Sequence, residues 1–343
     1  MPVPPTIESL DDIRNLLRDL PGPDAMAAAA AAEREPRLTK PPGALGRLET
    51  LNAWLAAWQG RHPPTVETPQ ARVFAGNHGI TAQGVSAYPS AVTAQMVANF
   101  AGGGAAVNQL CRTFGVDLTV EAMDLETPTR DFSQEAAMDE QTCAQAFATG
   151  MKAVDTKADV LCLGEMGIGN TTSAAAICHA LFAGDAADWT GPGTGVEGAA
   201  LDHKAQVVGQ AVTHHKATMH DPIEVLRHLG GRELAAICGA TVAARMARIP
   251  VVLDGYVCGA AAAVLAAFAP GALDHCQIGH ASSEPGHRRL LEKLDKRPIL
   301  DLEMRLGEAS GAVLAVGILR AAVACHTGMA TFDEAGVSDK DGD

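Results

Sequence analysis

The sequence lacks the patterns that mark several common classes of protein. Charged residues make up only 19% of it, and 26 Lys and Arg face 40 Asp and Glu, which gives a net charge of −14. An acidic surface of this size repels phosphate backbones and anionic lipids, so we expect no nucleic-acid partner and no membrane partner. A small anionic ligand stays possible, because backbone N–H groups can form a local anion site.

The eight cysteines include no C-x-x-C pair, and several lie in apolar runs, as Cys162 and Cys258 do. We therefore expect buried, reduced thiols in a cytoplasmic protein and no disulfide or zinc framework. The amino terminus has no basic stretch followed by an apolar segment, so we expect no secretory signal. The longest uncharged run, Tyr256–Leu273, is mostly Ala and Gly, which favours a buried helix over a membrane span.

What the sequence does contain is enough apolar residue, 47% of 343, to bury a large core. Its first sixty residues predict helices. Ser9 or Asp11 can cap a segment that ends at the Pro-Gly-Pro of residues 21–23, and Asp24 opens an alanine tract. A third apolar repeat at helical spacing covers residues 45–58, and residues 61–64 form a plausible boundary.

From residue 72 onward the pattern changes to short, continuous apolar runs with helix-like segments between them. The runs cover residues 72–76, 116–124, 159–164, 249–255, 275–279 and 298–302. Such strands fit a parallel sheet covered on both faces, so we predict an α/β fold with a doubly wound parallel sheet and a small helical unit. A last long helix is expected over about residues 310–325.

Ligands of such sheets bind at the carboxyl ends of the strands, and four segments there are rich in Gly and hydroxyl groups. They are residues 76–96, 164–176, 191–196 and 279–287. Together they favour a phosphate-bearing ligand, although each one alone could be an ordinary turn. The segment 164–172 lacks the lysine of a P-loop, and its glycine order differs from the dinucleotide fingerprint, so an oxidoreductase has little support.

Two carboxylates stand out at these strand ends. Glu308 follows a glycine before the last helix and is our candidate base, although a glutamate at a helix start can simply favour the helix dipole. Glu165 has the same two interpretations. We expect most of the twelve histidines to have surface or capping roles, and no H-E-x-x-H or other metal spacing is present. Tyr88 and Met96 could line an apolar slot for a flat ring. Lys204, taken by itself, is expected to be a solvated residue on a helix.

At these loops the sequence resembles the nicotinate-nucleotide–dimethylbenzimidazole phosphoribosyltransferase family of cobalamin biosynthesis. The resemblance covers nearly the whole chain, and the motifs appear in the family's order and spacing. They are KPPGALGRLE (40–49), GNHGITAQGVSAYP (76–89), LGEMGIGNTT (163–172), GPGTGV (191–196), GHASSEPGH (279–287) and LDLEMRLGEASGA (300–312).

This resemblance implies a Rossmann-like sheet plus a small helical domain made from both chain ends, in a homodimer. The small domain would cover residues 1–62, completed by about 310–335, and the large catalytic domain residues 63–309. The implied reaction moves the phosphoribosyl group of nicotinate mononucleotide onto 5,6-dimethylbenzimidazole, giving α-ribazole 5′-phosphate and nicotinate. The implied partners are these small molecules, with no metal and no organic cofactor.

Carried over by motif, Glu308 matches the catalytic base, and Glu165 matches the acidic residue near the reacting ribose. The residues implied to surround the nucleotide and its phosphate are Gly167, Gly193, Thr194, Gly195, Lys204, Ser282 and Ser283. Those implied to flank the benzimidazole are Tyr88, Pro89, Met96 and Leu306. One departure is Asn77, where the family often has aspartate, so we do not name it catalytic.

The chemistry suits a single carboxylate. The pyridinium nitrogen leaves as a neutral ring without a general acid, and the attacking benzimidazole must lose its N–H proton, a step worth roughly 10²–10⁴ in rate. One displacement inverts C1′ from β to α. The alternative is a non-catalytic nucleotide- or benzimidazole-binding protein on the same scaffold. The acceptor also stays open, since adenine, phenolic compounds and substituted benzimidazoles are all flat.

Overall fold

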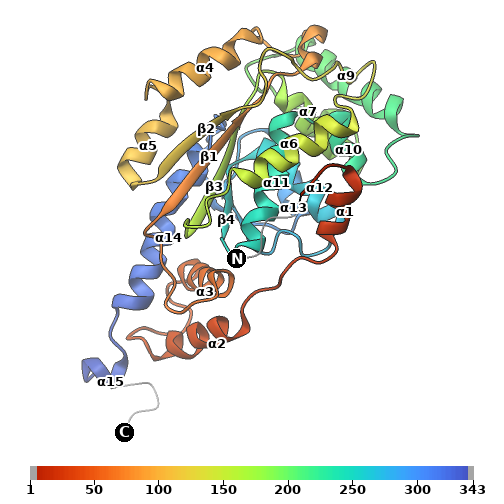
Figure 1. Ribbon diagram of the computed structural model, residues 1–343. Helices are drawn as coiled ribbons and strands as arrows, with labels where there is room; N and C mark the ends of the chain where they lie inside the picture. Colours follow the sequence, from red (N-terminus) through yellow and green to blue (C-terminus); the bar gives the residue numbers. More distant parts are fainter. Residues whose placement is uncertain (1–5, 339–343) are drawn as a thin grey trace.

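The computed structural model describes residues 6–338, which form a parallel sheet covered by helices on both faces (Figure 1). The strands are β1 (Pro69–Ala75), β2 (Asp117–Ala122), β3 (Val160–Met166), β4 (Val251–Leu253), β5 (Cys276–His280) and β6 (Pro298–Leu300). Their order across the sheet is β2-β1-β3-β4-β5-β6, and every neighbouring pair is parallel. Each predicted apolar run overlaps one of these strands, so the α/β prediction is confirmed.

The strands are apolar throughout because both of their faces are buried. In β3, Leu161 and Leu163 belong to one hydrophobic core, whereas Val160 and Cys162 belong to a second core on the opposite face. Successive side chains of a strand point to opposite faces, so a strand between two layers of helices has no place for a polar alternation.

The helices divide between the two faces of the sheet (Figure 1). One face carries α6 (Glu140–Lys152), α7 (Asn170–Phe182), α8 (Ala186–Trp189), α9 (Ala199–His215), α10 (Pro222–Leu229), α11 (Arg232–Met246), α12 (Tyr256–Phe268) and α13 (Pro285–Lys293). The other carries α3 (Arg47–Gln59), α4 (Ala91–Ala101), α5 (Ala106–Phe114) and α14 (Ser310–Gly328). The remaining short elements are α1 (Leu10–Leu17), α2 (Ala25–Arg34), η1 (Glu35–Arg37), η2 (Gly79–Gln83) and α15 (Phe332–Ala335).

The helix starts expected near the amino terminus are confirmed. Ser9 caps α1 in a capping box with Asp12, and the Asp24 side chain accepts the N–H of Ala27 at the start of α2. These side chains satisfy backbone N–H groups that a first helical turn leaves without partners.

Segments from the first sixty residues and from the last described helices pack together beside the sheet. Leu38 forms an isolated β-bridge with Thr331, and the His326 ring lies 2.5 Å from a Glu35 oxygen. Helices α2 and α3 pack together, and α3 also packs on α14. Helix α1 behaves differently, since it packs on α6 and its Arg14 binds Asp221 before α10. Its apolar face therefore joins the core of the sheet rather than the small helical unit that the sequence assigned it to.

Two apolar helices pack as core elements. The first ten residues of α12 are all buried, which confirms the buried helix expected for that run. Helix α14 is long and apolar enough to cross a membrane by length and composition alone, but it packs on β3, β5, α3 and α5. The cysteines are free thiols, and all except the half-buried Cys325 are buried, as expected.

Candidate active site

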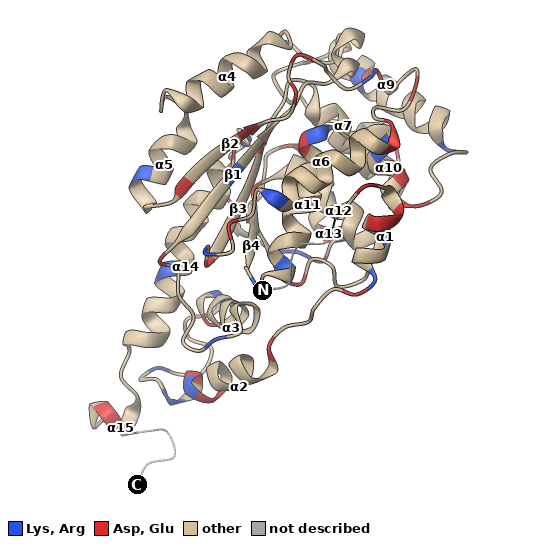
Figure 2. Cartoon of the chain, in the orientation of Figure 1, with Lys and Arg blue, Asp and Glu red and all other residues tan. Residues whose placement is uncertain are grey.

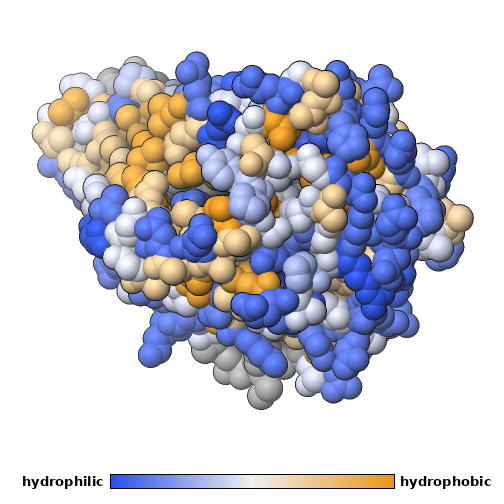
Figure 3. Space-filling model, turned by 90° about the horizontal axis from the view of Figure 1, so that it is seen from above, coloured by the Kyte–Doolittle hydropathy of each residue, from blue (hydrophilic) through white to orange (hydrophobic). Residues whose placement is uncertain are grey.

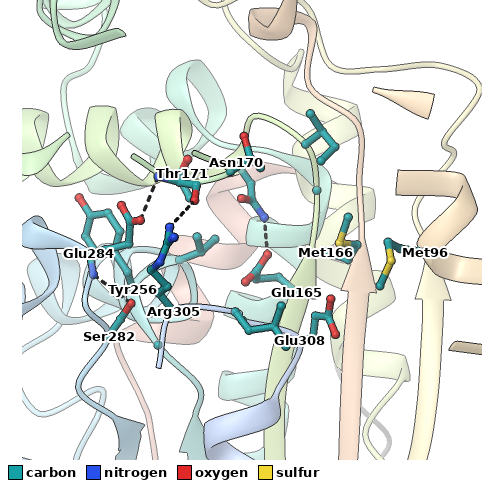
Figure 4. Close-up of a pocket in the computed structure, with 18 of the residues that line it drawn as sticks. Met96, Glu165, Met166, Asn170, Thr171, Tyr256, Ser282, Glu284, Arg305 and Glu308 are labelled. Carbon is teal, nitrogen blue, oxygen red and sulfur yellow. Dashed lines mark hydrogen bonds between the residues drawn. The ribbon is translucent and has the colours of Figure 1, made fainter. Parts of the chain in front are cut away.

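A cavity of about 670 Å³ opens at the carboxyl ends of the strands. The strand order reverses between β1 and β3, and a crevice at such a reversal is the usual ligand site of an open α/β sheet. Figure 4 shows Glu165 from the end of β3 and Glu308 from the turn before α14 beside each other, with Thr171, Ser282 and Glu284 across the cavity.

A strained turn carries Glu308 into the cavity. Gly307, Glu308 and Ala309 have φ values of +84°, +62° and +62°, in the left-handed region that non-glycine residues rarely adopt. The Ser310 hydroxyl donates to the Gly307 carbonyl at 2.6 Å and closes the turn. Strain of this kind is held at functional sites by the surrounding structure. Here it directs a 5% exposed carboxyl group into the pocket.

Asp254, directly after β4, holds the start of α14 next to this turn. Its Oδ1 accepts the N–H groups of Gly311 at 2.7 Å and Ala312 at 3.0 Å, in the first turn of α14. Helix α14 has no side-chain cap of its own, because its N-cap residue is Ala309. A residue far away in the sequence therefore satisfies the orphan N–H groups at the start of this helix.

Burial raises the pKa of both candidate carboxyl groups. Burial, with a smaller contribution from the nearby charge of Asp254, raises the pKa of Glu308 to about 7. Burial and the charges of Asp254, Glu233 and Glu308 raise the pKa of Glu165 to about 8, against an opposing hydrogen bond from the Asn170 amide. A carboxylate with a pKa near neutrality is a far better base than an exposed one, since basicity follows pKa.

Lys204 is a buried residue and not the solvated one that its sequence context suggested. It is 1% exposed, and its Nζ donates to the Thr171 hydroxyl at 2.8 Å and to the Gly191 carbonyl at 2.9 Å. Burial lowers the pKa of Lys204 to about 8, and the Glu284 charge opposes that shift. The ammonium group thus joins the start of α7 to the glycine loop at 191–196.

The same glycine loop is held from two further sides. Glu284 accepts the N–H of Gly193 at 2.9 Å, and Arg305 donates to the Gly193 carbonyl at 3.2 Å (Figure 4). The hydroxyl of Thr194 lies 2.9 Å from that of Ser86, which fixes the loop that carries Tyr88. Among the cavity-lining residues in the described chain, Arg305 is the single Lys or Arg.

Apolar side chains form one wall of the cavity. Val92 and Met96 come from α4, Met166 from the end of β3, and Leu306 from the segment before Glu308. Tyr88 and Leu306 are each 55% exposed at the rim, which is unusual for large apolar residues in this protein. The wall and the Glu308 carboxyl border the same space, so a flat apolar ring placed there would meet the carboxyl group.

Comparison with known proteins gives one answer at three levels. A family profile described as phosphoribosyltransferase matches residues 20–337. The chain is 60% identical over 330 residues to the nicotinate-nucleotide–dimethylbenzimidazole phosphoribosyltransferase of Rhizobium etli, covering 96% of this chain and 97% of that one. It is 59% identical over 331 residues to the enzyme of the same name from Sinorhizobium fredii, with 96% and 98% covered.

The chain belongs to the nicotinate-nucleotide–dimethylbenzimidazole phosphoribosyltransferase family. Its structure also matches the crystal structure of CobT from Thermus thermophilus, with a TM-score of 0.85 and 42% identity over 91% of this chain and 99% of that one. The family resemblance and the fold expected from the sequence are therefore both confirmed.

The structure brings together nine of the residues predicted from the family motifs. The cavity lining includes Glu165, Glu308, Gly167, Gly193, Thr194, Ser282, Tyr88, Met96 and Leu306. Four others do not line it. Gly195, Ser283 and Pro89 are exposed nearby, and Lys204 lies buried behind the loop. Asn77 is also outside the cavity, where its amide donates to the Leu125 carbonyl. The roles of all these residues stay predictions.

The expectation that most histidines have surface or capping roles was wrong. Seven of the twelve are buried, at positions 78, 215, 228, 275, 280, 287 and 326. His78 lies 2.5 Å from Glu233 and 3.1 Å from the Ser173 hydroxyl, directly behind the pocket, and His280 lines the pocket itself. Most of the buried rings have interior hydrogen-bond partners, as His78, His215 and His275 do. Over residues 6–338, no group of three or more His, Cys, Asp or Glu has the arrangement of a metal site.

Sequence reasoning missed several pocket residues of this phosphoribosyltransferase fold. Glu284 and Arg305 lie inside motifs that carried the resemblance, yet neither was singled out. Asn170 and Thr171 belong to the glycine-rich segment 164–176, but only Gly167 and Glu165 of that segment were predicted as site residues. Asp254 lies behind the pocket, outside its lining, and stands near the end of the predicted run 249–255; that place at a strand end was the signal that could have identified it.

Proposed function

We propose that this protein transfers the phosphoribosyl group of nicotinate mononucleotide to 5,6-dimethylbenzimidazole. The products are α-ribazole 5′-phosphate and nicotinate, and the step belongs to the assembly of the lower ligand of cobalamin. The proposal rests on family membership over almost the whole chain and on the shared names of its relatives.

In this proposal the glycine-rich strand-end loops bind the nucleotide. The proposed contacts are Gly167, Gly193, Thr194, Gly195, Lys204, Ser282 and Ser283. The phosphate would approach backbone N–H groups of these loops, which attract anions even in a chain of net charge −14. Lys204 would act from behind the loop, through Gly191 and Thr171, because both of these contacts are in place.

The benzimidazole would lie against the apolar wall of Tyr88, Met96 and Leu306, with Pro89 at the rim. Its attacking nitrogen gains positive charge as the bond to C1′ forms, and its N–H proton passes to the Glu308 carboxylate. The electrons of the breaking C1′–N bond return to the pyridinium nitrogen, so nicotinate leaves as a neutral ring system. One displacement inverts C1′, and holding the two rings on either side of C1′ supplies the orientation.

The observation that carries this mechanism is the position of Glu308. Its carboxyl group is buried, has a pKa raised to about 7, and borders the same cavity as the apolar wall. A base with that pKa is ionised in a large fraction of molecules at neutral pH and still holds a proton well.

We further propose that the chain works as a cytoplasmic homodimer with the two-domain division expected from the sequence, except that α1 belongs to the large domain, where its apolar face is buried. The uncharged helix α4 supports the dimer, because Ala91, Ala94 and Ala98 are exposed and Val92 and Met96 are half-buried on its surface. Figure 3 shows apolar surface gathered on the side where α4 and α5 lie in Figure 1. Buried free thiols suit a reducing compartment. Light scattering of the purified protein at several concentrations tests the dimer.

The reaction itself is tested by mixing the protein with nicotinate mononucleotide and a panel of flat bases. We expect release of nicotinate together with α-ribazole 5′-phosphate, whose anomeric configuration NMR can assign. Binding of both substrates without any nicotinate release would instead support a non-catalytic binding protein. A β-configured product would contradict the single displacement, because two successive displacements retain configuration.

A further inference from the structure

Four buried carboxyl groups lie at or behind the floor of the pocket: Glu165 and Glu308 line it, and Asp254 and Glu233 lie behind, close enough to act on the charge of Glu165. Glu165 ends β3, Asp254 follows β4, Glu308 precedes α14, and Glu233 lies in the first turn of α11 (Figure 2 marks acidic positions in red). Each is at most 8% exposed. Four ionised carboxylates in one water-poor space repel one another strongly, because charges interact more in a low dielectric.

Two of the four have partners that stabilise a negative charge. Asp254 accepts two N–H groups from the start of α14, and Glu233 lies 2.5 Å from the His78 ring. Glu165 and Glu308 form no ion pair with any cation over residues 6–338, and Glu165 receives only the Asn170 amide. The surplus proton of the cluster therefore belongs on Glu165 or Glu308.

The surroundings of the two groups decide between them. Glu165 has acids on three sides, from β4, α11 and the turn before α14, and each of these raises its pKa. Among the acids, only Asp254 raises the pKa of Glu308. The other titratable groups in and behind the pocket are His78, His280, Tyr88, Tyr256, Glu284, the Cys258 thiol, Lys204 and Arg305. None of them donates a hydrogen bond to Glu165, and Arg305 donates to Gly193 instead.

The substrate adds to the excess of negative charge in the pocket. The nucleotide of the proposed reaction is a net anion, because its phosphate and its nicotinate carboxylate together outweigh the positive pyridinium ring. It enters a pocket with a single lining Lys or Arg among the described residues, Arg305. An ionised Glu165 would add one more negative charge beside these groups. A neutral acid removes that repulsion and offers a donor where a carboxylate offers none.

We propose that Glu165 works as a neutral carboxylic acid that donates a hydrogen bond to a ribose oxygen, while Glu308 alone acts as the ionised base. The inference rests on the proposed transferase function. Glu165 Oε2 accepts from Asn170, so the proton lies on Oε1, which faces Gly307 at the turn that carries Glu308. Glu165 keeps this proton throughout the reaction, and Glu308 takes the one from the benzimidazole.

Glu165→Gln tests the proposal, because glutamine is neutral, has nearly the same shape and can donate. We expect it to keep at least about a tenth of the wild-type kcat at neutral pH. The alkaline limb of the kcat profile, near pH 8, should disappear while the acidic limb stays. A limb from Lys204, whose pKa is also about 8, belongs to kcat/KM for the nucleotide and should stay there. Glu308→Gln, the matched control, should lose about 10²–10⁴-fold. Glu165→Ala, which cannot donate, should be much weaker than Glu165→Gln.

Two results would overturn the proposal: a Glu165→Gln enzyme as inactive as Glu308→Gln, or an alkaline limb that persists in it. Infrared spectra of folded Glu308→Gln protein give an independent measurement. They should show a protonated carboxyl band that titrates near pH 8 and is absent when Glu165→Gln is added, and its absence from the outset would contradict the proposal. If the wild-type protein forms no ribazole phosphate, the proposed function fails first. An active wild type with an inactive Glu165→Gln refutes only this inference.

Discussion

Gly307 shows how closely single residues determine this site. It adopts φ +84°, and a Cβ placed on it would collide with Glu165 Oε1. Only glycine tolerates both the backbone conformation and the close approach of the carboxyl group. The residue therefore allows Glu165 to lie directly against the turn that carries Glu308.

Gly307→Ala should therefore displace Glu165 and Glu308 together. We expect kcat to fall at least about tenfold and the free energy of unfolding to drop by roughly 1–3 kcal/mol. Gly43→Ala is the control, since Gly43 has φ +77° and no atom near its Cβ position. It should show the backbone cost without loss of kcat. Equal kcat losses in the two variants would contradict the account.

Lys204→Met tests the buried ammonium group. It leaves the Gly191 carbonyl and the Thr171 hydroxyl without their donor, so the loop at 191–196 loses its anchor. We expect the KM for the nucleotide to rise about tenfold or more, with a smaller change in kcat. Lys216→Met, at an exposed lysine just past α9, should leave both constants unchanged. An unaltered nucleotide KM in Lys204→Met would remove Lys204 from the binding account.

The limits of sequence reasoning are clearest for individual side chains. Glu308 and Glu165 could be found because a strand end followed by glycine places a carboxylate at the crevice. The burial of Lys204 could not, because its surroundings come from α7 and from the loop at 191–196 rather than from its own helix. The prediction of surface or capping roles for most histidines was wrong for the same reason, since the contacts that bury these side chains come from distant segments.

At the scale of whole elements, the first turn of α14 is capped by a residue that follows a strand far away in the sequence. Asp254 after β4 holds its first N–H groups and also helps to raise the pKa of Glu308. The start of the helix and the strength of the base are thus set by the same carboxylate.

Asp254→Asn should move the acidic limb of the kcat profile to lower pH. The amide oxygen still accepts the N–H groups of α14, but the negative charge that raises the pKa of Glu308 is gone. Asp159→Asn is the matched control, because Asp159 is also buried but lies at the opposite end of the sheet. It should leave the profile where it is. An acidic limb unmoved by Asp254→Asn would show that Asp254 does not act on Glu308.

The helices and strands were largely predictable because they follow from local patterns. Continuous apolar runs indicated each strand, and Ser9 and Asp24 marked helix starts. Helix α1 was the exception, since its sequence predicts an amphipathic helix but not which core receives its apolar face. That choice is made by the distant segments against which Leu10, Ile13 and Leu17 are buried, and the ion pairs of Arg14 with Asp221 and Glu224 accompany it.

At the scale of the whole molecule, the site should reduce stability at high pH. The pKa values of Glu165 and Glu308 are higher in the folded state than their ordinary value of 4.5. The folded protein therefore binds more protons than the unfolded chain above about pH 4.5. Their favourable contribution is complete below that pH and is lost as the pH rises through about 7 and 8.

The difference in Tm between Glu165→Gln and the wild type should therefore favour the variant more at pH 9 than at pH 6. Each pH unit in that window changes the free energy of unfolding by up to about 1.4 kcal/mol per group. Lys204 has the opposite sign, because its pKa is lowered to about 8, so the comparison must use the difference between variants. A Tm difference independent of pH would show that Glu165 carries no raised pKa.

The central claim is that the Glu308 carboxylate removes the proton of the incoming base. The rate of nicotinate release by Glu308→Gln, measured with nicotinate mononucleotide and dimethylbenzimidazole present, tests it most directly. We predict a fall of about 10²–10⁴ in kcat with wild-type nucleotide affinity and wild-type Tm. Nicotinate release at the wild-type rate would contradict the account.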